Sequence, residues 1–187
     1  MSVRQINDFE KKIISNSLSQ ISNKFTVLLG ENRYYLNVIL NQESKKNQIP
    51  VYLIHEKLNL FKQIVNFPNI FSLGLYFGFI KKGVFFLSLE GAEFLYKENY
   101  ISKKCQLIVN EEGEKAILYG NNVLKKMILS FPLEIKINRI VIILNEIKEL
   151  LAIGLNKIDG NYFNKYHSED LIVANLVDKG YYLRKEN

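Results

Sequence analysis

The sequence predicts an α/β domain followed by a compact mixed β-barrel, and three observations support this fold class. The first half of the 187-residue chain alternates helical and strand-like patterns. The second half consists mostly of short strand-like segments separated by turn residues. A polar and charged stretch at residues 97–104 joins the halves, so we expect one domain at 1–97 and another at 98–187.

The first domain is expected to combine helices with a mixed or antiparallel sheet. Apolar residues at helical spacing predict a helix over residues 3–21, and a second helix is predicted at 56–67, where Pro68 ends it. Ser88 has a side chain suited to cap a third helix that runs to Tyr96. Strands are predicted at 25–29, 34–40, 51–54, 71–80 and 84–87, with turns at 30–33 and 81–83 and a loop at 41–48.

The second domain is expected to contain several short strands and one or two small helices. Asn110 is predicted to cap a helix whose first turn holds Glu111 and Glu112, because carboxylates are favourable at the positive end of a helix. Strands are predicted at 105–109, 123–126, 139–144, 150–155, 171–176 and 181–184. Short strands with few helices are typical of a compact mixed barrel.

Composition limits the classes of function. A hydrophobic share of 48% indicates a folded chain, and a net charge of +6 favours an anionic partner. Residues 1–97 hold 12 basic and 7 acidic side chains (+5), whereas residues 98–187 hold 13 and 12 (+1). RNA binding by the second domain would therefore require a local basic patch.

Cysteine and histidine counts narrow the chemistry further. A single cysteine, Cys105, excludes an internal disulfide, and with only His55 and His167 beside it a four-ligand zinc site built from cysteine and histidine alone is also excluded. No segment has the layout of a signal peptide or a membrane span, so we expect a soluble intracellular protein with neither a metal nor a membrane partner.

The stretch AILYGNNVLKKMI at residues 116–128 is the strongest candidate for a binding site. A helix that stops at Gly120, next to Asn121 and before Lys125 and Lys126, would place backbone N–H groups beside positive charge. A phosphodiester backbone could lie closely on such a surface. The alternative is an ordinary glycine helix stop. Strand alternation would send the two lysines to opposite faces, so one of them is expected to face a ligand.

Basic and aromatic residues also interleave late in the chain. Lys157 and Lys165 lie in the loop between two late predicted strands, where Tyr162, Phe163 and Tyr166 interleave with them. Aromatic rings among cations can stack on unpaired bases, with roughly 1–3 kcal/mol per base. Two alternatives remain open: the lysines serve solubility, and the rings cover the barrel. Arg184 is a further candidate, which either meets RNA or pairs with an acidic neighbour.

Catalysis has little support in the sequence, so no catalytic residue and no cofactor is expected. The glycine-rich fingerprints of nucleotide-binding loops are absent. His167 lies near Glu169 and Asp170, but a lone histidine in a loop is usually a surface residue. Cys105 falls within a predicted strand, where a thiol usually packs as a small hydrophobic group.

Three motifs resemble those of a known family. The motifs are SLGLYFG at residues 72–78, ILYGNNVLK at 117–125 and DKGYYLR at 178–184. In order and separation they resemble the nuclear-import-seven homologues, ribosome-biogenesis factors of archaea and eukaryotes with a C-terminal PUA domain. Asn122 stands where this family usually has histidine, and Asn164-Lys165 stands where it has paired basic residues.

The resemblance implies a fold, a function and a location. It implies a PUA RNA-binding domain at 98–187, with Lys125 in the position of the family lysine. It also implies a non-catalytic factor of large-subunit biogenesis that binds precursor ribosomal RNA, single-stranded or irregular, and meets other assembly proteins through its first domain. Such a factor is cytoplasmic, or nucleolar in a eukaryote. Two alternatives stay open: an accessory or specificity subunit of an RNA-modifying enzyme, and a protein-interaction scaffold.

Overall fold

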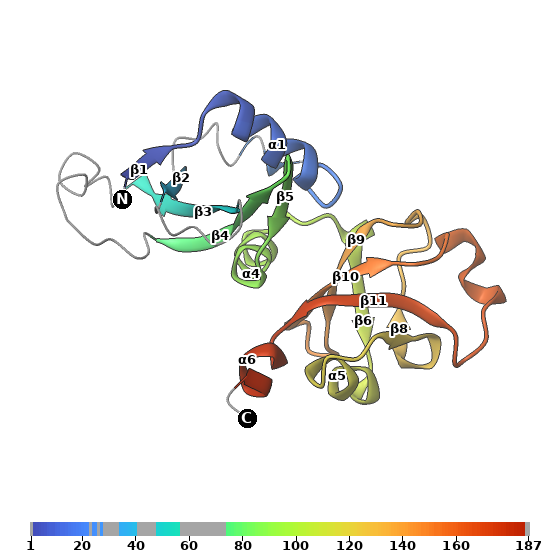
Figure 1. The fold of residues 1–187 in the computed structure, drawn as a ribbon. Coiled ribbons are helices and arrows are strands. Elements are labelled where there is room, and N and C mark those ends of the chain that lie inside the picture. Colours follow the sequence, from blue (N-terminus) through green and yellow to red (C-terminus); the bar gives the residue numbers. More distant parts are fainter. Residues whose placement is uncertain are drawn as a thin grey trace. The chain divides into compact units, whose positions relative to one another are not determined.

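The protein divides into two compact units, residues 1–94 and 95–187 (Figure 1). The structure is a computed structural model that describes residues 2–22, 24–25, 27, 34–40, 48–56 and 74–185. The turn at 30–33, all but the first residue of the predicted helix at 56–67 and nearly all of the loop at 41–48 lie outside these residues. The domain boundary after Lys97 stays a prediction, which limited proteolysis of the junction at 97–104 would test.

Five strands form an antiparallel sheet in the described part of the first unit. The strand order is β1-β2-β3-β4-β5, so each strand pairs with its neighbour along the chain. This confirms an α/β domain with an antiparallel sheet. The strands are β1 (Ser2–Gln5), β2 (Tyr34–Leu40), β3 (Gln48–His55), β4 (Leu75–Lys81) and β5 (Val84–Leu87).

The N-terminal helix is shorter than predicted. Residues 2–5 form β1, and helix α1 (Asp8–Leu18) begins only after Asn7, whose side chain accepts a hydrogen bond from the Glu10 backbone N–H. Val3 and Ile6 fit a helical spacing, but the backbone of Val3 pairs with Ile39, and this long-range partner is invisible to a local pattern. The predicted strand at 25–29 is also wrong where it can be examined, because Phe25 and Val27 are helical.

The core of the first unit lies between the sheet and α1, which packs on β4 and β5 (Figure 1). Phe77 is fully buried and stacks on Phe25 and Phe85, with ring centroids 6.0 Å and 5.7 Å away. The predicted β4–β5 hairpin is confirmed. Ser88 accepts a hydrogen bond from the Gly91 N–H and begins helix α4 (Leu89–Lys97) as expected.

The second unit is a mixed sheet that is nearly closed into a barrel. Its strand order is β7-β11-β10-β9-β6-β8, in which β6 and β9 run parallel and the other pairs are antiparallel. The two strands at the ends of this order, β7 and β8, are joined by the 3-10 turn η3 (Lys125–Met127), so the chain itself closes the barrel. The strands are β6 (Gln106–Val109), β7 (Val123–Leu124), β8 (Ile128–Ser130), β9 (Ile140–Leu144), β10 (Leu150–Asn156) and β11 (Leu171–Asp178).

Inward-facing aliphatic side chains fill the barrel, and short helical segments surround it. Leu107, Ile117 and Val173 are fully buried in this core. The helical segments are η2 (Lys103–Cys105), α5 (Glu111–Leu118), η3 (Lys125–Met127), η4 (Gly160–Lys165) and α6 (Gly180–Lys185). Asn110 caps α5 as predicted, since its side chain accepts a hydrogen bond from the Gly113 N–H.

Two predictions for this unit are wrong. The strand predicted at 123–126 ends at Leu124, because the chain turns through η3 to reach β8, so strand alternation does not apply to Lys125 and Lys126. The strand predicted at 181–184 is the helix α6. Gly180 begins α6 so close to the Leu118 carbonyl oxygen that a Cβ there would lie only 1.9 Å from that oxygen.

Candidate nucleic-acid interface

Gly120 ends α5 in a left-handed conformation. Its φ is +85°, its N–H donates to the Ile117 carbonyl at 2.8 Å, and the Asn121 N–H donates to the Ala116 carbonyl at 2.9 Å. These two bonds form a Schellman motif, in which the N–H groups close the helix end. The backbone at Gly120 therefore has the geometry of an ordinary glycine helix stop, and the N–H groups of both residues have intramolecular acceptors. The side chain of Asn121 remains exposed.

Arg184 lies beside Gly120 and fixes this helix end. Its guanidinium makes two hydrogen bonds to the Asp178 carboxylate, each 3.0 Å, and Nη1 also donates to the Leu118 carbonyl. A Cβ on Gly120 would lie 3.1 Å from the same guanidinium. The Asp178 side chain is 5% exposed and raises the pKa of Arg184 through these hydrogen bonds. Asp178 is therefore an acidic partner of Arg184, as in one of the two alternatives that the sequence left open.

The side chain of Lys125 extends from η3 to η4, another helical segment of the second unit. Its Nζ donates to the carbonyl oxygens of Asn164 (3.2 Å) and Tyr166, and lies 5.4 Å from the centre of the Phe163 ring. That ring stacks on Phe131 at 4.4 Å. An ammonium group has three N–H donors, so the two carbonyls leave one for a further acceptor. No carboxylate of the described residues pairs with Lys125.

Lys126, the next residue, has a different environment. Its Nζ lies 3.0 Å from a Glu112 carboxylate oxygen and 3.4 Å from one of Glu169, and these hydrogen bonds raise its pKa. Its backbone N–H donates to Ser168. Since two carboxylates already surround this ammonium, its charge is compensated within the protein.

Lys157 precedes η4, and Lys165 is the last residue of η4. Lys165 lies 4.9 Å from the centre of the Tyr162 ring, and that tyrosine is 53% exposed. Lys157 is exposed and joins the barrel through its N–H, which donates to Ile172. Within the described residues, neither lysine forms an ion pair. The structure thus brings Lys125 and Lys165 together around η4, whereas Gly120, Asn121 and Arg184 form a separate group at the end of α5.

Sequence reasoning missed the residues that organise the group at α5. Asn175 donates to Asp178 (3.0 Å) through its side chain, and its N–H donates to the Asn122 side chain (3.0 Å). No local signal identifies Asn175 as a partner of Asn122, which lies more than fifty positions earlier. The one available clue was the polar pair within β11, a strand that is otherwise apolar on its buried face.

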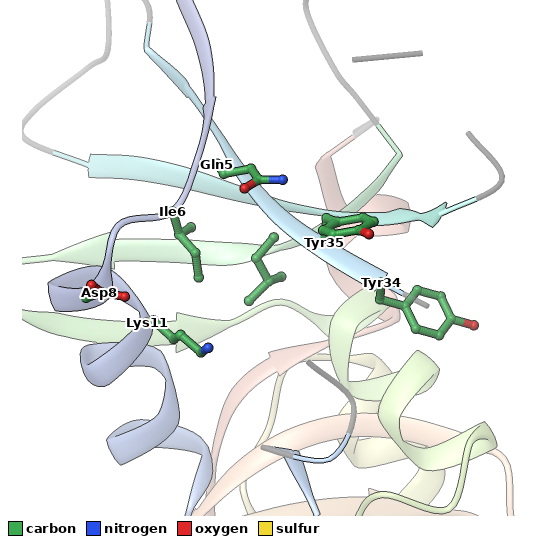
Figure 2. A pocket seen from close by; sticks show the side chains of 7 residues that line it. Gln5, Ile6, Asp8, Lys11, Tyr34 and Tyr35 are labelled. Atoms are coloured by element: carbon green, nitrogen blue, oxygen red, sulfur yellow. The ribbon is translucent and has the colours of Figure 1, made fainter. Parts of the chain in front are cut away.

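Neither a pocket in the described part of the first unit nor the thiol of Cys105 forms a competing site. A pocket of about 170 Å³ lies in the first unit where β1 leads into α1 (Figure 2). Its two charged residues, Asp8 and Lys11, have opposite signs and favour no anion. No group of three or more His, Cys, Asp or Glu in the described residues is arranged to hold a metal ion. Burial raises the pKa of the Cys105 thiol, which disfavours a nucleophilic thiolate.

No helix in the described part of the chain has the length and apolar character that a membrane crossing requires. His167 does not form a catalytic constellation with the acidic residues near it. Its side chain is 91% exposed, and its contact with Asp170, 3.6 Å away, is at the surface. The N–H of His167 donates to the same carboxylate at 2.7 Å, which is a turn-stabilising bond.

The comparisons with known proteins identify the barrel of the second unit as a PUA-type fold. Residues 105–187 match the family described as UPF0113 PUA domain. Over its whole length the chain is similar to a UPF0113 protein of Archaeoglobus fulgidus, with 26% identity over 186 residues that cover 100% of this chain and 97% of the relative. It is also similar to the 60S ribosome subunit biogenesis protein NIP7 of Saccharomyces cerevisiae, with 25% identity over 188 residues and coverages of 99% and 98%.

A solved structure supports the fold across both units. A conserved PUA domain protein from Thermoplasma acidophilum superposes with a TM-score of 0.62 at 17% identity and covers 99% of each chain. The predicted resemblance to nuclear-import-seven homologues is confirmed, and so is the fold class: an antiparallel sheet with helices followed by a PUA-type barrel.

Proposed function

We propose that the protein is a non-catalytic RNA-binding factor in the biogenesis of the large ribosomal subunit. PUA domains bind RNA, and the full-length likeness to a 60S biogenesis protein favours this role over an accessory subunit of an RNA-modifying enzyme. The ligand is precursor ribosomal RNA in a single-stranded or irregular form. The observation that carries the proposal is a group of barrel lysines that have no carboxylate partner among the described residues, two of which lie beside the partly buried ring of Phe163 and the exposed ring of Tyr162.

Lys125, Lys157 and Lys165 are the proposed phosphate contacts. Each carries a charge that no carboxylate of the described residues compensates, so binding RNA can release counterions at these positions. Tyr162 lies beside Lys165 and is exposed, which suits stacking on an unpaired base.

The group at the end of α5 plays a smaller part in the proposed interface. Gly120 allows an RNA backbone to approach closely, and Asn121 offers an exposed amide. The three hydrogen bonds of Arg184 leave two of its five N–H donors for a phosphate oxygen. Lys126 contributes least, because Glu112 and Glu169 hold its ammonium.

The remaining parts of the proposal follow from the family. The first domain contacts other ribosome-assembly proteins, and the protein acts in the cytoplasm, or in the nucleolus of a eukaryotic cell. It requires no cofactor, and the RNA is bound without being modified.

A salt titration tests the RNA proposal. Affinity for uridine- or adenine-rich oligomers is measured between low and moderate salt for the wild type and for a Lys125→Ala, Lys157→Ala, Lys165→Ala triple variant. We expect the triple variant to bind all sequences more weakly and to flatten the salt slope by about two units, since single-stranded contacts contribute about 0.7 each. The matched control is Lys103→Ala, Lys115→Ala, Lys148→Ala, which removes the same charge from other parts of the barrel. Wild-type affinity in the first triple variant would place the RNA surface elsewhere.

A further inference from the structure

Four aromatic side chains line up across neighbouring strands of the first unit. We call Tyr52, Tyr76, Phe79 and Phe86, from β3, β4 and β5, the aromatic strip. Tyr52 lies opposite Tyr76 in the ladder with ring centroids 5.6 Å apart, and Phe79 lies opposite Phe86 with centroids 5.0 Å apart. Since Pro50 pairs with Phe79 and lies two residues before Tyr52, both ring pairs are on one face of the sheet.

The strip is on the opposite face from the buried core. Phe85 is 4% exposed and stacks in the core, so its neighbour Phe86 projects to the other side. A bulge in β4 separates the adjacent residues Tyr76 and Phe77, because Tyr52 pairs with Tyr76 while Val51 pairs with Gly78. Consecutive aromatic residues therefore serve different purposes: Phe77 fills the core, and Tyr76 belongs to the strip.

The outer rings of the strip are accessible. Tyr76 is 36% and Phe86 46% exposed, whereas their ladder neighbours Tyr52 and Phe79 are partly buried. Burial also raises the pKa of Tyr52 above its ordinary value of 10.0. Aromatic surface that lies exposed on a sheet is a feature of binding faces.

The charges around the strip favour an anionic, aromatic ligand. The sequences of β2 to β5 contain no aspartate or glutamate. Lys81 ends β4 opposite Val84, and Lys82 follows in the turn with a φ of 49°. In the described residues neither lysine forms an ion pair with a carboxylate. Residues 1–97 also carry +5 of the net charge of +6.

We propose that the aromatic strip is a second RNA site, on which unpaired bases stack while Lys81 and Lys82 contact phosphates. Sheets that bind single-stranded RNA do so through exposed aromatic residues on adjacent strands, and stacking accepts any base because each has a π face. The proposal rests on the proposed function in taking RNA as the ligand, but it assigns a contact outside the PUA barrel. A protein partner would not need stacked rings flanked by lysines on a strand surface without acidic residues.

Conservative substitutions in the full-length protein test the strip. The variant Tyr76→Leu, Phe86→Leu keeps apolar area but removes the π faces, and we expect it to bind a labelled uridine oligomer about tenfold more weakly with an unchanged salt slope. The variant Tyr76→Phe, Phe86→Tyr keeps the rings, and wild-type affinity is expected. Phe9→Leu is the matched control, since Phe9 is 72% exposed on α1 outside the strip. Circular dichroism establishes that each variant is folded.

The outcomes separate this site from the barrel. Wild-type affinity in the leucine variant, together with loss of affinity in the barrel triple-lysine variant, would overturn the strip and leave the proposed function standing. No RNA binding by the wild type would overturn both. A leucine variant that keeps RNA affinity but no longer associates with assembly proteins would make the strip a protein-docking face, which also overturns the proposal.

Discussion

The side chains of Arg184 and Lys126 form ion pairs with carboxylates of the protein. By contrast, the ammonium group of Lys125 contacts carbonyl oxygens and an aromatic ring, and that of Lys165 contacts an aromatic ring. The first pair is bound by Asp178 in one case and by Glu112 and Glu169 in the other. For the second pair, the contacts to carbonyls and to the rings of Phe163 and Tyr162 leave the positive charge uncompensated. A cation that is already paired releases few counterions when RNA arrives, so the two kinds of basic residue should differ in binding.

The comparison divides the basic residues of this small barrel into a structural group, whose charge carboxylates of the protein compensate, and a proposed ligand-directed group, whose charge no carboxylate of the described residues compensates. Arg184 ties α6 to the end of α5 through Leu118 and to β11 through Asp178. Lys126 ties η3 to α5 and to the residues before β11. Net charge alone would count these residues equally with Lys125 and Lys165, although carboxylates of the protein already compensate their charge.

The largest expected effect is on the structural group. In Gly180→Ala, the new Cβ would meet the Leu118 carbonyl oxygen at 1.9 Å, so α6 must move away from α5 and Arg184 with it. Overpacking against backbone should cost about 3 kcal/mol of unfolding free energy. Urea denaturation measures this loss. The control is Gly83→Ala, where a Cβ meets nothing within 4 Å and only the positive φ of 75° is strained. Equal stability of Gly180→Ala and the wild type would contradict the close packing of α6.

A smaller loss is expected at the helix stop. Gly120→Val places a β-branched residue at φ +85°, which costs about 1–2 kcal/mol, and brings its Cβ within 3.1 Å of the Arg184 guanidinium. Gly120→Asn should cost less, because asparagine tolerates this conformation. Denaturation gives the stability and an RNA titration gives the affinity. If both variants weaken RNA binding although Gly120→Asn loses less stability, close approach to Gly120 matters for RNA as well as for folding, because either side chain blocks that approach. Wild-type RNA affinity in both variants would remove Gly120 from the interface.

Local sequence signals predicted the parts of this barrel that depend on local chemistry. Asn110 was identified as a helix cap because an N-cap requires only a side-chain acceptor and the N–H groups three residues later. The hairpin at 81–83 was identified from its turn residues. Lys125 and Lys126 were misassigned to a strand because β7 stops where the barrel closes, and closure depends on β8 and β11.

The pairing of the candidate site residues was harder to predict than the fold. The sequence around Arg184 does not show that the Asp178 carboxylate is buried or that it accepts two hydrogen bonds from the guanidinium. Asp178 ends a strand and Arg184 lies in the following helix, and neither strand nor helix spacing predicts a contact across the turn between these elements. The contacts of Lys125 with Asn164 and Tyr166 join segments about forty residues apart. Candidate residues were found by their chemistry, but their division into two groups required tertiary structure.

Arg4 in the first unit is also paired with a carboxylate of the protein, and the pH dependence of stability tests this pair. Arg4 donates two hydrogen bonds to Glu10 (2.7 Å and 2.8 Å), and these lower the pKa of Glu10 below its ordinary value of 4.5. A carboxylate with a lowered pKa stabilises the fold above pH 4.5 and loses that contribution as the pH falls through its folded value. Unfolding free energy should therefore decline below pH 4.5, and by less in Glu10→Gln. A parallel decline in both proteins would assign the acid sensitivity to other groups.

The smallest effect is expected at Lys126, and its neighbour provides the matched comparison. Lys126→Ala removes an ammonium that Glu112 and Glu169 already hold, so RNA affinity should stay within about twofold of the wild type, as for a surface ion pair. Lys125→Ala removes the same charge one residue earlier, where no carboxylate of the described residues compensates it, and should flatten the salt slope by about 0.7 units. Titrations of both variants against one uridine oligomer over the same salt range give the two slopes directly. If the slopes change equally, partners within the protein do not determine which lysines meet RNA, and the division between structural and ligand-directed cations fails.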